Sequence, residues 1–489
     1  MKRRTALRLS VLGGATMAAR MMVDPVRATE RSIGPVGVPR FDLPLKIPTV
    51  LEPVARSDGH DEYHIVQRAA AQEILPGRAT TIWGYQGLFP GPTIRVRRNR
   101  AAVVRHTNQL STHTVVHLHG GAVPADSDGF ATDMVTPGAS RTYTYPNRQR
   151  AATLWYHDHA MDRTGENVFR GLAGFYIIED DEDLALPLPR GPFDVPLVFQ
   201  DRAFNADGSF AYDTGRHNGF EGDVMLVNGV PWPKMEVSAR KYRFRFLNGS
   251  NARLLQLTLN GTEPITLIGT EGGLLSQPVL ITTLPLAMAE RADVVIDFSR
   301  YDVGTKLFLM NVAEKPTFAQ IMRFDVVRRE ADDSRVPSRL SDPAFLERPK
   351  TATTRTWSLR AGLRYGEGLP PIAWTINGKP FDPNRSDAAI ALGDVELWRF
   401  RNEAPLGLPL RVLARPHPTH VHLAHFQILE RNGKPPLAHE RGWKDTVALD
   451  GIEDVLVLLR FSQFRGRYLL HCHNLEHEDH AMMARFDVT

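Results

Sequence analysis

Four His-X-His triplets stand out among the 18 histidines of the 489-residue chain. They pair His117 with His119, His157 with His159, His420 with His422, and His471 with His473. At this histidine content, chance would produce fewer than about one such triplet. Residues i and i+2 of an extended strand project from the same face, so each triplet presents two imidazoles side by side. Because eight imidazoles exceed what one ion can use, the spacing predicts a polynuclear metal site.

The single cysteine of the chain, Cys472, is the central residue of the last triplet. With one cysteine no intramolecular disulfide can form, and on a strand the thiol points away from the two flanking imidazoles. His477 and Met482 follow closely, and His417 directly precedes the third triplet. A buried cysteine or methionine alone would be an ordinary core residue. Two His, one Cys and a weak axial Met together are the ligands of a blue copper site, which predicts a second, mononuclear centre.

The elements that position these ligands are predicted to be strands in about three domains of roughly 150 residues. A turn rich in Asn, Gly and Pro, followed by a strand-like run that ends in Asn, recurs at 87–108, 228–248 and 377–402, which indicates a repeated domain. Short β-prone runs separated by many of the 38 Gly and 35 Pro predict β-sandwiches. We expect domains at 29–185, 186–340 and 350–489. Because two triplets fall in the first domain and two in the third, the polynuclear site is expected between them.

Positive charge gathers at the N-terminus. Of the formal net charge of +4, residues 1–28 carry +5 and the remainder −1, so charge gives no reason to expect a nucleic-acid partner. The paired Arg3 and Arg4, the moderately apolar stretch 7–22 and the small-residue site ending at Ala28 predict a twin-arginine signal peptide at 1–28. We therefore expect the twin-arginine export machinery as a partner, a periplasmic or extracellular location, and no membrane span in the mature protein.

Four stretches resemble the copper motifs of the multicopper oxidases: HLHGG from His117, WYHDH from Trp155, HPTHVHL from His417 and HCHNLEHEDHAM from His471. The likeness is strongest to the three-domain bacterial branch of spore-coat laccases and phenoxazinone synthases. It extends through GYQGLFPGPTI, DSDG, YPNRQR, ERADVVIDF and GWKDT, and so covers nearly the whole chain after the signal segment. The resemblance implies an all-β fold of three consecutive cupredoxin-like Greek-key β-sandwich domains and four copper ions per chain.

Carried onto this sequence, the family motifs imply a ligand set for each copper. The type 2 copper would be held by His117 and His420, and the type 3 pair by His119, His157, His159, His422, His471 and His473. The type 1 copper would be held by His417, Cys472 and His477, with Met482 as the axial ligand. Every ligand position of the family is filled. This weighs against a copper-free scaffold protein of the same fold.

Two carboxylates match positions that the family uses near its oxygen site, Glu478 and Asp128. Each could deliver protons to reduced oxygen or could orient a ligand imidazole through a hydrogen bond. We expect proton delivery from Glu478, whereas both roles stay open for Asp128. Leu423 stands where many relatives have Gly, and Asn474 stands where close relatives have an apolar residue. For Asn474 we expect an effect on the potential or on water access.

The resemblance implies that a small reducing substrate gives single electrons to the type 1 copper and that dioxygen is reduced to water. The substrate is expected beside His477 or His417, where the edge of a ring would reach the surface. Phenols, aromatic amines or bilirubin-like compounds are the expected substrates of such a laccase. The alternative is a metallo-oxidase acting on Cu(I), Fe(II) or Mn(II), but the 13 Met include no methionine-rich insert. A monomer is expected.

Overall fold

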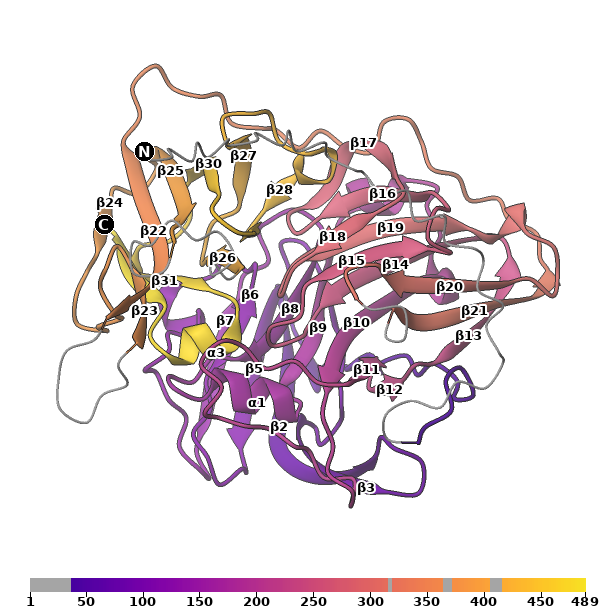
Figure 1. The fold of residues 1–489 in the computed structure, drawn as a ribbon. Coiled ribbons are helices and arrows are strands. Elements are labelled where there is room, and N and C mark those ends of the chain that lie inside the picture. Colours follow the sequence, from indigo (N-terminus) through magenta and orange to yellow (C-terminus); the bar gives the residue numbers. More distant parts are fainter. Residues whose placement is uncertain (1–36, 315–318, 364–371, 405–415) are drawn as a thin grey trace, which may run out of the picture.

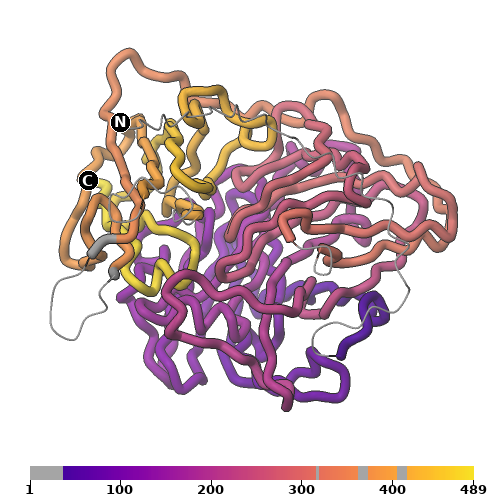
Figure 2. The backbone as a smooth tube through the Cα atoms, viewed as in Figure 1, coloured from indigo at the N-terminus to yellow at the C-terminus, as the bar shows by residue number. Residues whose placement is uncertain are grey.

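The computed structural model describes residues 37–314, 319–363, 372–404 and 416–489 (Figures 1 and 2). The expected signal segment, 1–28, lies outside these residues. In the described part the chain is mostly strand, with short α-helices at Thr164–Arg170 (α1), Asp181–Ala185 (α2) and Leu475–Asp479 (α3). None of the helices described is long and apolar enough to cross a membrane. The all-β prediction is confirmed.

The strands form six sheets, which fall into three pairs along the chain. The first pair holds β1 (Ala55–Arg56), β2 (His60–Glu73), β3 (Ala79–Tyr85), β5 (Ala101–Asn108) and β7 (Ser140–Tyr145) in one sheet, and β4 (Ile94–Arg97), β6 (Val116–His119), β8 (Ala152–Asp158) and β9 (Ala173–Glu179) in the other. Burial alternates along β5, where every second residue from Ala102 to Asn108 is buried. This period of two is what a strand with one core-facing side requires. Tyr63 of β2 and Tyr176 of β9 bring the two sheets into one apolar core.

The second pair is the largest. One sheet contains β10 (Asp194–Arg202), β11 (Val224–Val227), β12 (Val230–Pro231), β14 (Lys241–Asn248), β16 (Ile265–Thr270), β17 (Gly273–Ile281) and β19 (Arg291–Asp297), and the other contains β13 (Lys234–Ala239), β15 (Leu255–Leu259), β18 (Leu284–Leu286), β20 (Lys306–Asn311) and β21 (Gln320–Arg329). In β14, Phe244 and Phe246 join the core. Arg245 alternates with them and donates to Asp194 at 2.7 Å and to Thr153 of β8 at 2.9 Å. One face of this sheet therefore binds the first sheet pair through buried charges.

The third pair carries the C-terminal ligands. One sheet contains β22 (Thr354–Leu363), β23 (Ile372–Ile376), β25 (Val395–Asn402), β27 (Phe426–Arg431), β28 (Trp443–Lys444) and β30 (Asp454–Arg460), and the other contains β24 (Ala388–Ile390), β26 (His417–Val421), β29 (Thr446–Leu449), β31 (Gly466–Cys472) and β32 (Met483–Val488). The three pairs span 55–179, 194–329 and 354–488. We propose 29–185, 186–340 and 350–489 as the domain bounds, since each contains one pair.

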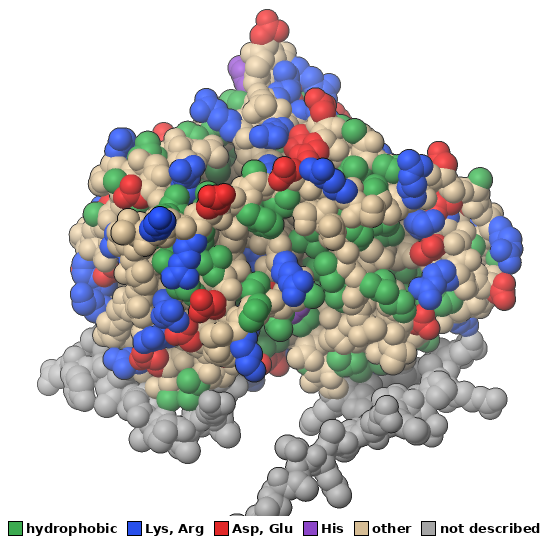
Figure 3. Space-filling view, turned by 90° about the horizontal axis from the view of Figure 1, so that it is seen from above, with side chains coloured by type: hydrophobic (Ala, Val, Ile, Leu, Met, Phe, Trp, Pro, Cys, Tyr) green, Lys and Arg blue, Asp and Glu red, His purple; other side chains and the backbone are tan. Residues whose placement is uncertain are grey.

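The first and third sheet pairs meet at two short helices, α1 and α3, which lie side by side (Figure 1). The carboxylate of Asp479 in α3 accepts hydrogen bonds from the backbone amides of Thr164 and Gly165 at 2.8 Å each. These amides belong to the first turn of α1, which has no partner for them within the helix. On the face drawn in Figure 3, Lys and Arg side chains are interspersed with Asp and Glu, so no field of one sign dominates it.

Candidate metal centres

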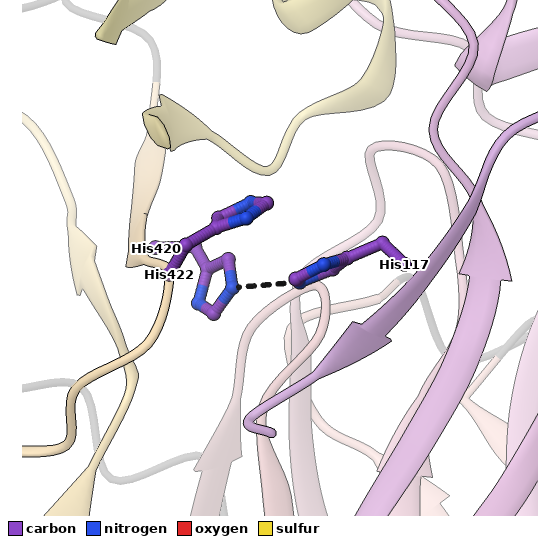
Figure 4. A group of neighbouring side chains, drawn as sticks. All are labelled: His117, His420 and His422. Atoms are coloured by element: carbon purple, nitrogen blue, oxygen red, sulfur yellow. Dashed lines mark hydrogen bonds between the residues drawn. The ribbon is translucent and has the colours of Figure 1, made fainter. Parts of the chain in front are cut away.

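The four histidine triplets meet between the first and third sheet pairs. β6 and β8 are antiparallel with His117 opposite His157, and β26 and β31 are antiparallel with His420 opposite His471. Figure 4 shows His117 facing His420 and His422 across this boundary. All eight side chains of the triplets are buried. The expected site between the first and third domains is thus assembled by two strand pairs that come from opposite ends of the chain.

Two sets of three rings and one pair can be distinguished, and rings of different sets also stack, His117 on His422 at 3.8 Å and His119 on His420 at 3.6 Å between centroids. His119, His157 and His473 have ring centroids 5.0, 5.1 and 5.6 Å apart, and His159, His422 and His471 have centroids 4.8, 5.2 and 5.2 Å apart. The remaining rings are His117 and His420, whose Nε2 atoms are 3.4 Å apart. Two nitrogen ligands of one tetrahedral ion about 2.0–2.1 Å away lie roughly 3.4 Å from each other. The grouping therefore fits three ions, two with three imidazoles and one with two.

Hydrogen bonds outside the cluster decide which ring nitrogen points inward. Nδ1 of His117 donates to the carbonyl of Asp128 at 2.6 Å, and Nδ1 of His420 donates to the carbonyl of Asp445 at 2.9 Å. Their Nε2 atoms then keep the free lone pair that a metal needs. Both nitrogens of His473 are buried and have no hydrogen-bond partner in the described structure. Unpartnered buried nitrogens of this kind fit a metal ion as the missing partner.

The mononuclear site is formed by β26, β31 and α3. Nδ1 of His417, Sγ of Cys472 and Nδ1 of His477 lie 3.1–3.6 Å from one another, and all three side chains are buried. Met482 is also buried, and its backbone bonds both to Cys472 at 3.1 Å and to His477 at 2.9 Å. Burial raises the pKa of the Cys472 thiol, so the thiolate needs a positive charge beside it. The soft sulfur and two imidazoles fit copper.

Comparison with known proteins decides the family. Sequence models described as multicopper oxidase match residues 68–183, 166–330 and 351–489. The chain is 37% identical to a laccase of Bacillus subtilis, with 92% of this chain and 98% of that protein covered. It is 38% identical to a bilirubin oxidase of Albifimbria verrucaria, with 92% and 82% covered. The chain is a multicopper oxidase.

Solved structures extend the likeness to the fold of the oxidase. A laccase from Pediococcus acidilactici is 31% identical, covers 92% of this chain and 95% of its own, and superposes with a TM-score of 0.83. The three cupredoxin-like domains expected from the sequence are confirmed by this match together with the three sheet pairs. The family also implies copper, and the buried sulfur and nitrogen donors above are consistent with it.

The two predicted carboxylates contact the same group of three rings. Oδ2 of Asp128 lies 2.7 Å from Nδ1 of His422, and Glu478 places one oxygen 3.0 Å from Nδ1 of His471 and the other 3.5 Å from Nδ1 of His159. Burial would raise the pKa of Glu478, but the two imidazoles beside it lower the pKa to about 2. Burial raises the pKa of Asp128 well above its usual range. Both carboxylates are therefore within reach of ligand rings, where an orienting role is direct.

Two charged residues that sequence reasoning missed support the cluster of the oxidase. Asp445 accepts from Nε2 of His119 at 3.1 Å and from both terminal nitrogens of Arg291 at 2.9 and 2.5 Å. Arg291, at the start of β19, also donates to the carbonyls of Thr153 and Ala289. The acceptor on Nε2 leaves Nδ1 of His119 for a metal. These residues lie in the stretches GWKDT and ERADVVIDF, so the resemblance of those stretches to the family was the signal that could have identified them.

A glycine makes room for this ion pair. Gly120, directly after the first triplet, has φ of +82°, and a Cβ at this position would lie 2.6 Å from both the Arg291 guanidinium and the Asp445 carboxylate. A larger residue would be strained there and would also separate the two charges. Gly120, the first glycine of HLHGG, therefore allows Arg291 of the second domain to bind Asp445, which is the hydrogen-bond partner of His119.

Trp374 of β23 covers the mononuclear site. Its ring lies 3.7 Å from that of His477, centroid to centroid, and its Nε1 donates to the carbonyl of His217 at 2.7 Å. His477 is 0% exposed and His417 1% exposed. The expectation that the edge of the His477 or His417 ring reaches the surface is wrong. Both rings are buried, and Trp374 packs against the ring of His477.

Asn474 has a structural role at the same site. It caps α3, with Oδ1 3.4 Å from the backbone amide of His477, and its own backbone amide donates to Sγ of Cys472 at 3.4 Å. The cap gives a polar side chain a structural reason at this position. The expected effect of Asn474 on the potential or on water access stays a prediction.

Proposed function

We propose that this multicopper oxidase is laccase-like and couples one-electron oxidation of a small reducing substrate to the four-electron reduction of dioxygen to water. The proposal rests on the end of β31, which joins the mononuclear site to the histidine cluster. Cys472 lies in the mononuclear site, and its chain neighbours His471 and His473 lie in two different groups of the cluster. An electron that enters at Cys472 needs to cross only the flanking peptides to reach either group.

The ring grouping supports a definite set of ligands. We assign the type 2 copper to His117 and His420, one type 3 copper to His119, His157 and His473, the other type 3 copper to His159, His422 and His471, and the type 1 copper to His417, Cys472, His477 and Met482. When bound, these ions supply one-electron redox chemistry and a place for dioxygen. On this assignment we propose four copper ions per chain.

The protein contributes burial, orientation and protons. The cluster rings are closed off from solvent, which prevents side reactions of partly reduced oxygen. Asp128 holds Nδ1 of His422, and we assign it to orientation. The two oxygens of Glu478 lie 3.0 and 3.5 Å from Nδ1 of His471 and His159, and Glu478 is the carboxylate that we assign to proton delivery.

Substrates of the laccase class are favoured by the relatives. Among the similar proteins are those named laccase and bilirubin oxidase, and we propose phenols, aromatic amines or bilirubin-like compounds as electron donors. The alternative is a metallo-oxidase, since a structure described as a metallo-oxidase, from Campylobacter jejuni, is 26% identical with a TM-score of 0.80. Oxygen-uptake rates with phenols and bilirubin against Cu(I), Fe(II) and Mn(II) separate the two. Faster turnover of the metal ions would refute the laccase assignment.

The type 1 assignment is tested on the purified protein. Copper-loaded protein should hold close to four coppers per chain and be blue, because a thiolate bonded to Cu(II) absorbs strongly. Cys472→Ser should lose the colour and substrate oxidation, yet keep the other three coppers, since all of their assigned ligands are imidazoles that the substitution leaves in place. A colourless wild-type protein with full copper would show that Cys472 is not a ligand.

We propose a periplasmic or extracellular monomer, delivered through the twin-arginine signal at 1–28, with no nucleic-acid partner. A cell division protein FtsP of Escherichia coli is 33% identical over 85% of this chain. A copper-free scaffold protein of the same fold would not need the donor groups that this chain brings together at both sites. Copper content distinguishes it from an oxidase.

A further inference from the structure

A cavity of about 220 Å³ lies where segments of all three domains meet. Its walls include Arg98, Arg148 and Arg150 of the first domain, Gly272 of the second, and His425 and Arg460 of the third. Among the described residues that line it there is no Asp or Glu. Four guanidinium groups around one small cavity without a lining carboxylate create a strongly positive site.

Three of these arginines lack the partners that arginines have elsewhere in the molecule. Within the described structure, the side chains of Arg148, Arg150 and Arg460 form no ion pair or hydrogen bond, whereas Arg98 donates to the carbonyl of Arg148 at 3.4 Å and lies 3.7 Å from Asp180. The buried Arg243, by contrast, binds two carboxylates. Arg98, Arg148 and Arg460 are exposed and can be solvated, whereas Arg150 is partly buried, and a partly buried guanidinium without an acceptor indicates that its partner is a ligand.

Arg150 provides the most direct observation. Its Nη1 is buried and has no hydrogen-bond partner in the described structure. Burial lowers the pKa of Arg150, even though Glu182 and Asp180 act to raise it. The nearby acidic groups therefore do not offset the cost of burying this guanidinium. An anion inside the cavity would supply the missing acceptor.

We propose that this cavity binds a small oxyanion with at least two negative charges, of the phosphate or polycarboxylate class. The planar donor fork of arginine matches the oxygens of both groups and binds them through paired hydrogen bonds. The volume admits an ion of the size of phosphate or citrate. The proposal is independent of the substrate assigned above.

The walls of the cavity are connected to the copper cluster. Gln149 accepts from the backbone amide of Ala122 at 2.7 Å and donates to the carbonyl of Gly120 at 2.8 Å, directly after the first triplet. On the other side, Nε2 of His425 lies 3.5 Å from Oδ2 of Asp445, whose Oδ1 accepts from His119. The bound anion therefore stabilises the segments that support the cluster, without contacting a ligand ring.

The test is binding to the copper-loaded protein, with inorganic phosphate and citrate as probes in separate titrations. Calorimetry should show one anion per chain, and the melting temperature should rise with the anion at constant ionic strength set by sodium chloride. Arg150→Met and Arg460→Met should each weaken binding about tenfold or more, since a hydrogen bond to a charged group contributes about 1.5–3 kcal/mol. Phosphate binding without citrate binding, or the reverse, identifies the class.

Arg329→Met is the matched control, since Arg329 is 73% exposed and pairs with Asp302 on the surface. It removes the same charge and should bind the probe as the wild type does. Arg460 is exposed, so its variant is expected to fold even if the Arg150 variant does not. Equal binding by wild type and both cavity variants would place the anion elsewhere, for example at the coppers. A rise in melting temperature that sodium chloride reproduces would reduce the effect to screening. Either result overturns the proposal.

Discussion

The ion pair between Arg291 and Asp445 predicts that the metal-binding cluster depends on a residue that touches no metal. Both side chains are at most 1% exposed, and Arg291 donates two hydrogen bonds to the carboxylate. Arg291→Met would keep much of the volume but leave Asp445 as an unpaired buried charge. Breaking a buried pair in this way costs about 3–5 kcal/mol. For a cooperative unit of 150–250 residues at about 2–4 °C per kcal/mol, the melting temperature should fall by about 6–20 °C.

The assay is calorimetry of the metal-free protein, so that copper binding does not mask the loss. Because three domains need not unfold in one step, the shift is read for each transition separately. Arg329→Met, which breaks an exposed pair, should leave every transition in place. Adding Asp445→Asn to Arg291→Met removes the unpaired charge and should restore part of the lost stability. Two results would contradict the role of the buried charge: an Arg291→Met protein with the melting temperature of the wild type, or a double variant less stable than Arg291→Met alone.

Three further predictions concern catalysis and export. Glu478→Gln should keep copper and the blue colour but slow reoxidation by dioxygen by about 10²- to 10⁴-fold in stopped-flow measurements, since an amide cannot take up and pass on a proton as the carboxylate can; loss of copper instead would make Glu478 an orienting residue. Trp374→Leu should also stay blue but lower the reduction potential of the type 1 copper in a redox titration, because water gains access to His477; an unchanged potential would contradict this shielding. Arg3→Lys with Arg4→Lys should keep the protein in the cytoplasm in cell fractionation, and normal export would indicate a general secretory signal.

The sequence predicted that the histidines of the four triplets gather at one place because their spacing has a direct geometric meaning. A His-X-His triplet on a strand always presents two rings on one face, whatever the rest of the fold. The triplets therefore predicted a shared, polynuclear site without any knowledge of sheet order. Their division into groups was not accessible in the same way. It depends on the register that sets His117 opposite His157 and on how two distant sandwiches pack.

The end of strand β31 shows a second limit of the pattern. Alternation along a strand holds only to Cys472, where β31 ends, and Asn474 then caps α3. The short helix turns His477 back, so that its Nδ1 lies 3.6 Å from Sγ of Cys472, five residues earlier in the chain. Residue types predicted this ligand pair, but the helix that joins the two was not predicted.

The second domain supplies no histidine to the cluster in the described structure, yet it holds the cluster through four consecutive residues of the third domain, 443–446. Lys444 binds Glu271 of the second domain through two bonds of 2.9 Å, and Asp445 binds Arg291. Thr446 then places its hydroxyl 3.1 Å from Nε2 of His119. A shift of this segment would move the hydrogen-bond partners of His119 and of His420, whose Nδ1 bonds the carbonyl of Asp445. Since these two rings belong to different coppers in our assignment, the second domain fixes the distance between them through buried charges.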